Sequence, residues 1–159
     1  MASKTDFFND LRQGNLEEVL SALKNNSDWI HSTDERGSTP LLLTTYYGHF
    51  DIAKSLLEHG AEVDAKDSSG NTALMGVCFK GYKNIAELLV GAGASVNHIN
   101  SMGATSLIYA ATFNKVGIAK LLLEHGADIN SKDARGNTAL DNAKMQEANE
   151  MIELLEKYG

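Results

Sequence analysis

The sequence predicts an all-α solenoid (α-solenoid), in which pairs of short helices stack along one axis and hairpin-like loops join successive pairs. Glycine recurs at an interval of 33 residues, and a threonine stands two positions after each of these glycines: Gly37, Gly70, Gly103 and Gly136. Two apolar columns keep the same period and lie four residues apart, which places both on one helical face. The columns are Ile52, Ile85, Ile118 and Met151, then Leu56, Leu89, Leu122 and Leu155. Repetition at this period is typical of a stacked array.

Residues 34–66 show how the first half of each unit is built. Asp34 to Gly37 predicts a tight turn, because Asp can hydrogen-bond nearby backbone and Gly adopts a positive φ without steric cost. Thr39 is expected to cap a helix whose first residue is Pro40, where the missing N–H is no loss. We expect this first helix to end near Tyr47.

The second half of the unit is a second helix, expected from Phe50 to His59. Gly48 separates the two helices, and Gly60 suits a left-handed cap at the end of the second. Isolated helices this short are only marginally stable in water. We therefore expect stacking between units to supply the stability.

Three places depart from this pattern. Asn114 stands where Gly48 and Gly81 stand in earlier units, and Asn tolerates the left-handed region. Glu147 occupies that position in the last unit, so we expect the turn there to be remodelled or the two helices to join. The first unit matches loosely, with one inserted residue expected around residues 27–29.

We expect the whole chain, residues 1–159, to form one domain of three full repeats between two capping units. The units are 1–33 (N-terminal cap), 34–66, 67–99, 100–132 and 133–159 (C-terminal cap).

Composition narrows the functional classes. The formal charge is −7, and the basic residues do not cluster as they do in proteins that bind nucleic acid or acidic membranes directly. Cys78 is the only cysteine, which excludes an intramolecular disulfide and favours a reducing compartment. Met1 to Asp10 has no apolar core of signal-peptide length, and no uncharged run could span a bilayer. We expect a monomeric, cytoplasmic protein.

Two phrases of the sequence resemble the ankyrin-repeat family, and the resemblance covers essentially the whole chain. The first runs from Asp34 to Leu41 (DERGSTPL), and the second from Leu121 to Asn130 (LLLEHGADIN), with a near copy at residues 56–65. The family's usual Thr-Pro-Leu-His phrase has lost its histidine in every unit, which is typical of a natural divergent array. The hydrogen bonds that this histidine makes in the family must be made by other groups here, or omitted. The residues at the histidine position are Leu42, Met75, Ile108 and Asp141.

The resemblance implies that the chain recognises a protein through its turn tips and the exposed faces of its first helices, which together line a concave surface. In the second unit these positions are Glu35, Arg36, Ser38, Tyr46 and Tyr47. In and around the third unit they are Lys66, Ser68, Ser69, Asn71, Phe79 and Lys80. Farther along the chain they are Ile99, Ser101, Met102, Thr112, Phe113, Arg135 and Met145.

Four aromatic residues stand out among these positions: Tyr46, Tyr47, Phe79 and Phe113, with Ile99 and Met102 at adjoining tips. Exposed aromatic residues and methionine are typical of interface centres. The alternative is that the rings simply fill space between stacked helices.

Catalysis finds little support in the sequence. The histidines are dispersed, so we expect them to be solvated residues at helix ends and in loops, and we expect no metal or other cofactor. Cys78 falls where the repeat usually has alanine, which favours a small buried residue over a nucleophile. Our hypothesis is a non-catalytic interaction module, an adaptor or inhibitor of an unidentified protein partner.

Two alternatives stay open. One is an enzyme or small-molecule binder on the same array, which would need a convergent polar pocket with shifted titratable groups. The other is a protein that regulates a nucleic-acid-binding partner indirectly.

Overall fold

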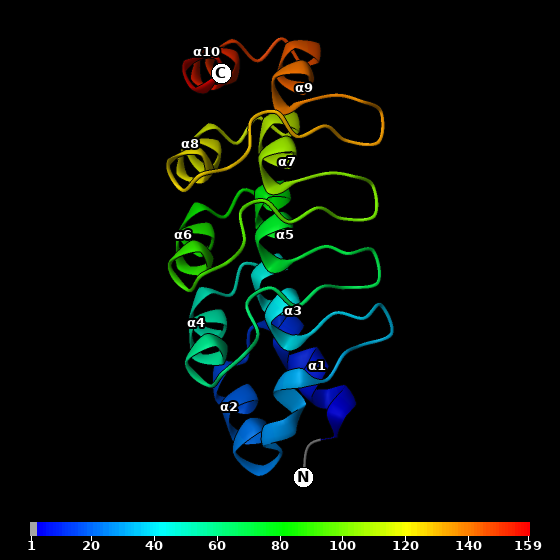
Figure 1. Cartoon of the computed structure of the whole chain (residues 1–159). Helices are drawn as coiled ribbons and strands as arrows, with labels where there is room; N and C mark the ends of the chain where they lie inside the picture. Colours follow the sequence, from blue (N-terminus) through cyan, green and yellow to red (C-terminus); the bar gives the residue numbers. More distant parts are fainter. Residues whose placement is uncertain (1–2) are drawn as a thin grey trace.

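The computed structural model describes residues 3–159 as two parallel columns of helices (Figure 1). One column, the inner helices, contains α1 (Lys4–Gln13), α3 (Pro40–Tyr46), α5 (Ala73–Lys80), α7 (Ser106–Thr112) and α9 (Ala139–Met145). The other column, the outer helices, contains α2 (Leu16–Asn25), α4 (Phe50–Glu58), α6 (Lys83–Gly91), α8 (Val116–Glu124) and α10 (Asn149–Tyr158). No strand occurs within residues 3–159, so the predicted all-α solenoid is confirmed. Met1 and Ala2, which begin the segment where we expect no signal peptide, lie outside the described residues.

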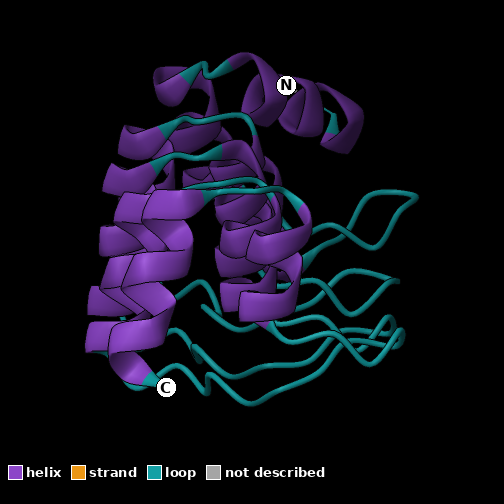
Figure 2. Ribbon diagram, turned by 90° about the horizontal axis from the view of Figure 1, so that it is seen from above, coloured by secondary structure: helices purple, strands orange, loops and turns teal. Residues whose placement is uncertain are grey.

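The hairpin loops, which lead from each outer helix to the next inner helix, project from the inner column (Figures 1 and 2). Each loop closes on an Asp or Asn side chain. Asp34 Oδ1 accepts the backbone N–H groups of Arg36 and Ser38, both at 2.9 Å. Equivalent bonds are made by Asp67, Asn100 and Asp133. Neighbouring loops are bonded to each other, as where the N–H of Ser101 donates to the carbonyl of Ser69.

The inner helices begin at the threonines that the repeat predicts. The hydroxyl oxygens of these threonines accept the backbone N–H three residues farther on, which satisfies a donor that the helix itself leaves unpaired. The caps are Thr39, Thr72, Thr105 and Thr138.

The turn between the two helices of a pair is the same throughout the array. Gly48 and Gly81 have positive φ, and Asn114 and Glu147 adopt the left-handed region at φ 56° and 54°. The expectation that the last turn is remodelled or lost is therefore wrong. The N–H of Ala148 donates to the carbonyl of Ala143 at 3.1 Å, and packing of α9 on α7 and of α10 on α8 holds the turn in place. A short 3-10 helix, η1 (Ser27–His31), lies where the inserted residue is expected.

The core is a continuous strip between the two columns. Both predicted apolar columns are buried along the whole array, and the four leucines at positions 56, 89, 122 and 155 have no exposed surface. This strip fixes the spacing of the inner helices, and with it the spacing of the side chains on their other face.

Candidate functional site: an aromatic groove on the inner helices

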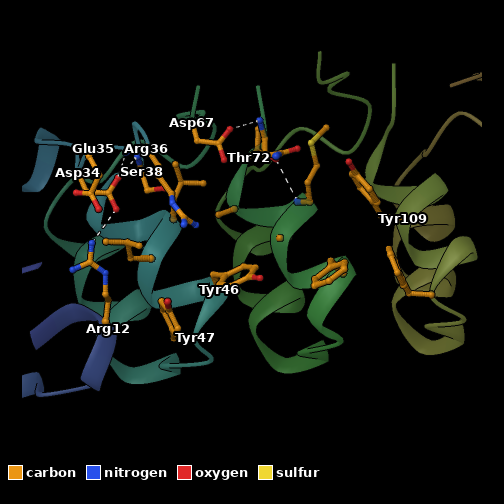
Figure 3. Close-up of a pocket in the computed structure, with 18 of the residues that line it drawn as sticks. Arg12, Asp34, Glu35, Arg36, Ser38, Tyr46, Tyr47, Asp67, Thr72 and Tyr109 are labelled. Carbon is orange, nitrogen blue, oxygen red and sulfur yellow. Dashed lines mark hydrogen bonds and ion pairs between the residues drawn. The ribbon is translucent and has the colours of Figure 1, made fainter. Parts of the chain in front are cut away.

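An open groove of about 780 Å³ lies where the inner helices meet the hairpin loops (Figure 3). Its walls come from α1, α3, α5 and α7 and from the loops that precede α3 and α5. Residues far apart in the sequence, such as Arg12 and Tyr109, therefore share one surface.

Five aromatic side chains run along this surface, and we call them the aromatic groove: Tyr46, Tyr47, Phe79, Tyr109 and Phe113. The rings of Tyr46 and Phe79 are nearly parallel, with centroids 6.5 Å apart. Phe79 meets Phe113 edge-on at 4.7 Å, and Tyr46 meets Tyr47 in the same way at 5.5 Å. Edge-on and offset contacts are the favourable arrangements of aromatic pairs.

These rings contact one another and still face solvent. Tyr46, Tyr47, Phe79 and Phe113 are 39% to 45% exposed, so they do not fill the buried strip between the helices. Tyr109 is half-buried, and its hydroxyl accepts a bond from the Asn100 amide at 2.8 Å.

Charged side chains from α1, α5 and the first hairpin loop border the groove. Arg12 pairs with Asp34 at 3.1 Å, and the Asp34 side chain is only 5% exposed. Lys80 Nζ lies 4.9 Å from the centre of the Tyr46 ring, within the range of a cation–π interaction. Glu35 and Arg36 stand at the exposed tip of the first hairpin loop.

The structure brings together eight of the residues that the sequence analysis assigns to partner binding. The lining includes Glu35, Arg36, Ser38, Tyr46, Tyr47, Asn71, Phe79 and Phe113. The others lie outside it: Lys66, Ser68, Ser69, Lys80, Ile99, Ser101, Met102, Thr112, Arg135 and Met145. Ile99, Met102 and Met145 are well exposed, whereas Thr112 is half-buried and donates its hydroxyl to the carbonyl of Ile108.

Several lining residues were missed from the sequence. Arg12 belongs to the first unit, which does not follow the repeat. The repeat pattern in the sequence therefore could not indicate that Arg12 pairs with Asp34. Tyr109 and Gly76 occupy one repeat position, 33 residues apart, and comparing the units at that position could have found both.

Three side chains of the described residues have a clearly shifted pKa. Burial raises the pKa of the Cys78 thiol to about 12, partly offset by a hydrogen bond with Ser106, and Cys78 has no exposed surface. The pKa of Asp133 is lowered, chiefly by the N–H of Asn137, and that of Asp141 by its bonds with Thr138. All three residues lie outside the groove lining.

Two histidines differ from expectation. His49 Nε2 lies 2.8 Å from the carbonyl oxygen of Arg12, and His98 Nε2 lies 2.9 Å from that of Gly70. Both rings are half-buried and link one unit to another, so the expectation that all the histidines are simply solvated is wrong for these two. Within residues 3–159, no group of three or more His, Cys, Asp or Glu side chains is placed to hold a metal ion.

No helix in the described part of the chain has both the length and the apolar character needed to cross a bilayer.

A family model for ankyrin repeats (3 copies) matches residues 11–100 and 77–159. Such repeats are generally protein–protein interaction modules and are typically non-catalytic. Since the match spans nearly the whole chain and the structure has the helix pairs and hairpin loops described above, the chain belongs to the ankyrin-repeat family.

Proposed function

We propose that this chain is a non-catalytic adaptor or inhibitor that binds a partner protein through the aromatic groove and the adjoining loop tips. One observation carries the proposal: aromatic side chains from three successive units form one connected, partly exposed surface. Aromatic residues at the centre of a surface contribute most of the binding energy in many protein interfaces. The outer helices offer no comparable cluster among the exposed large apolar residues.

A small-molecule binder is the second candidate, and the volume of the groove favours it. About 780 Å³ falls within the usual range of ligand pockets. However, two carboxylates of the groove are already occupied, since Asp34 and Asp67 accept backbone N–H groups of their own turns. The three side chains with a shifted pKa, Cys78, Asp133 and Asp141, lie outside the groove.

We further propose that the protein acts as a monomer in the cytoplasm. A lone buried thiol suits a reducing compartment. A monomer leaves the aromatic groove accessible, whereas a dimer formed through the groove would cover it. Light scattering at the concentrations used for binding checks this, and a dimer that the groove variant below disrupts would contradict it.

The test compares a groove variant with an outer-helix variant. The first carries Tyr46→Ala and Phe79→Ala, and the second carries Lys54→Glu and Glu87→Lys on the exposed surface of α4 and α6. The wild type and the two variants are each used to capture partners from the cells that make this chain, and quantitative mass spectrometry identifies the captured proteins. We expect a protein that the wild type and the outer-helix variant retain and the groove variant loses.

The affinity for that protein is then measured by titration. The groove variant should lose about 2 kcal/mol or more of binding free energy, as expected when two interface aromatics are truncated. Its melting temperature should change little, because both rings are about 40% exposed. Loss of binding in the outer-helix variant, with the groove variant unaffected, would overturn the proposal.

A further inference from the structure

The floor of the aromatic groove contains a helix position that lacks a side chain. Gly76 lies in the interior of α5, and the equivalent residues one unit before and after it are Leu43 and Tyr109. All three line the groove, so Gly76 leaves a gap between two large side chains.

Neither packing nor backbone geometry explains this glycine. A methyl group at Gly76 would meet only Cδ1 of Tyr46, at 3.6 Å, which is an ordinary van der Waals contact. Gly76 is helical and is not among the residues with positive φ. Because glycine destabilises a helix interior relative to alanine, the gap itself is the feature that the glycine provides.

Charge is distributed unevenly between the two layers of the array. Within residues 32–159, the hairpin loops with α3, α5, α7 and α9 carry six Lys or Arg against five Asp or Glu, and α4, α6, α8 and α10 with their following loops carry five against eleven. The first set covers residues 32–47, 65–80, 98–113 and 131–146, and the second covers 48–64, 81–97, 114–130 and 147–159.

Most carboxylates of the inner layer are held in their own turns. Four of the five accept backbone N–H groups: Asp34, Asp67, Asp133 and Asp141. Glu35 is the remaining carboxylate of these loops and of α3, α5, α7 and α9, and it lines the groove beside Arg36. The cations Arg36 and Lys80 are placed at the rim, Arg36 in the lining and Lys80 over the Tyr46 ring.

We propose that the groove binds an acidic segment of a partner protein, with a bulky apolar side chain seated over Gly76 and carboxylates beside Arg36 and Lys80. The inference rests on the proposed function and adds the chemistry of the partner. The gap beside Tyr46 suits an apolar anchor, and the two cations suit carboxylates that flank the anchor in the partner's sequence. The attraction between these cations and the carboxylates of the partner should weaken with added salt.

The first step of the test is a selection from random displayed peptides of about 12 residues, which extend to about 40 Å. The full chain is the target, and peptides that the Tyr46→Ala, Phe79→Ala variant also binds are removed. We expect the remaining peptides to share one bulky apolar residue flanked by Asp or Glu. Enrichment of basic or uncharged peptides would overturn the inference and leave the proposed function standing, whereas peptides that never distinguish the two proteins would overturn both.

The second step measures the affinity of one selected peptide for variants of Gly76. Gly76→Leu fills the gap and should weaken binding about tenfold or more, the effect of losing one anchor. Gly76→Ala should raise the melting temperature and weaken binding less, which keeps the inference testable if the leucine variant folds poorly. Unchanged affinity in Gly76→Ala, or in a folded Gly76→Leu, would show that the anchor lies elsewhere.

The third step exchanges charge. Lys80→Glu should lower the affinity for the acidic peptide several-fold. It should raise the affinity for a peptide whose acidic residues are replaced by lysine. Both changes in affinity should become smaller at high salt. Lys54→Glu on α4 is the matched control and should leave both affinities unchanged. If Lys80→Glu and Lys54→Glu changed the two affinities equally, the effect would come from the net charge of the chain. The proposed contact of Lys80 with a carboxylate of the partner would then be wrong.

Discussion

At the scale of single residues, the hairpin loops show that each turn needs an oxygen acceptor rather than a charge. Asp34 and Asn100 occupy the same repeat position and accept the same pair of backbone N–H groups through Oδ1. Asn100 also has an amide donor, which reaches both the side-chain oxygen of Asn71 and the Tyr109 hydroxyl at 2.8 Å. A carboxylate has no such donor, so the asparagine couples this loop to the groove.

Cys78 supports a prediction at the same scale. Its folded pKa of about 12 lies above the ordinary 9.0, because burial disfavours the thiolate. The free energy of unfolding should therefore be unaffected by this group below pH 9.0 and should fall as the pH rises toward 12, by up to about 1.4 kcal/mol per pH unit. Denaturant melts at several alkaline pH values measure this fall.

The control is Cys78→Ala, which keeps the other alkaline titrations and removes the thiol. The stability difference between the two proteins should narrow or reverse as the pH rises. Thiol reagents should also label the folded wild type slowly, since the thiol has no exposed surface. If the stability of the wild type and of Cys78→Ala changed with pH in the same way, and thiol reagents labelled the native wild type quickly, Cys78 would not be a buried structural residue.

At the scale of elements, the turn between paired helices predicts that mutations at two equivalent positions change the free energy of unfolding in opposite directions. Glu147 is exposed and held at φ 54°, where a side chain costs about 1 kcal/mol relative to glycine. Glu147→Gly should therefore raise the free energy of unfolding by about 0.5–1 kcal/mol. Gly48→Ala should lower it by more than that, because a methyl group there would lie 2.9 Å from the Tyr82 ring at φ 81°.

Chemical denaturation of both variants checks these signs. A destabilised Glu147→Gly protein would mean that the glutamate side chain makes a compensating interaction in this turn.

The elements were largely predictable from the sequence, because a repeated pattern gives the same local signal several times. The threonine caps, the turn aspartates and the apolar columns recur at one spacing, and helix positions followed from them. The last turn was not predictable in this way. A glutamate disfavours the left-handed backbone conformation, but packing against the neighbouring units imposes that conformation on Glu147. The Arg12–Asp34 pair joins a unit outside the repeat to one inside it, so periodicity could not reveal it.

At the scale of the whole molecule, each unit is stabilised by its neighbours rather than by a core of its own. α6 packs against both α4 and α8, whereas α10 has α8 on one side of it and no further outer helix on the other. Stability in such arrays is a sum of unit and interface contributions. A partner that spans several units through the groove would also resist fraying of the ends.

Truncation of equivalent leucines in the two places tests this view. Leu89 in α6 and Leu155 in α10 are both fully buried, so their burial alone predicts equal effects. Leu89→Ala should lower the stability of the whole array by about 2–5 kcal/mol, because it weakens a unit that supports neighbours on both sides. Leu155→Ala should lower it less and instead let the last unit unfold on its own.

Denaturant melts give the two losses, and hydrogen exchange locates them. In Leu155→Ala the amides of α9 and α10 should exchange faster while those of α5 and α6 keep their protection; in Leu89→Ala protection should fall along the central units. If both variants lost equal stability and exchanged uniformly, the chain would behave as one cooperative globule. The groove would then owe its shape to a single shared core, and a change in any unit would alter it.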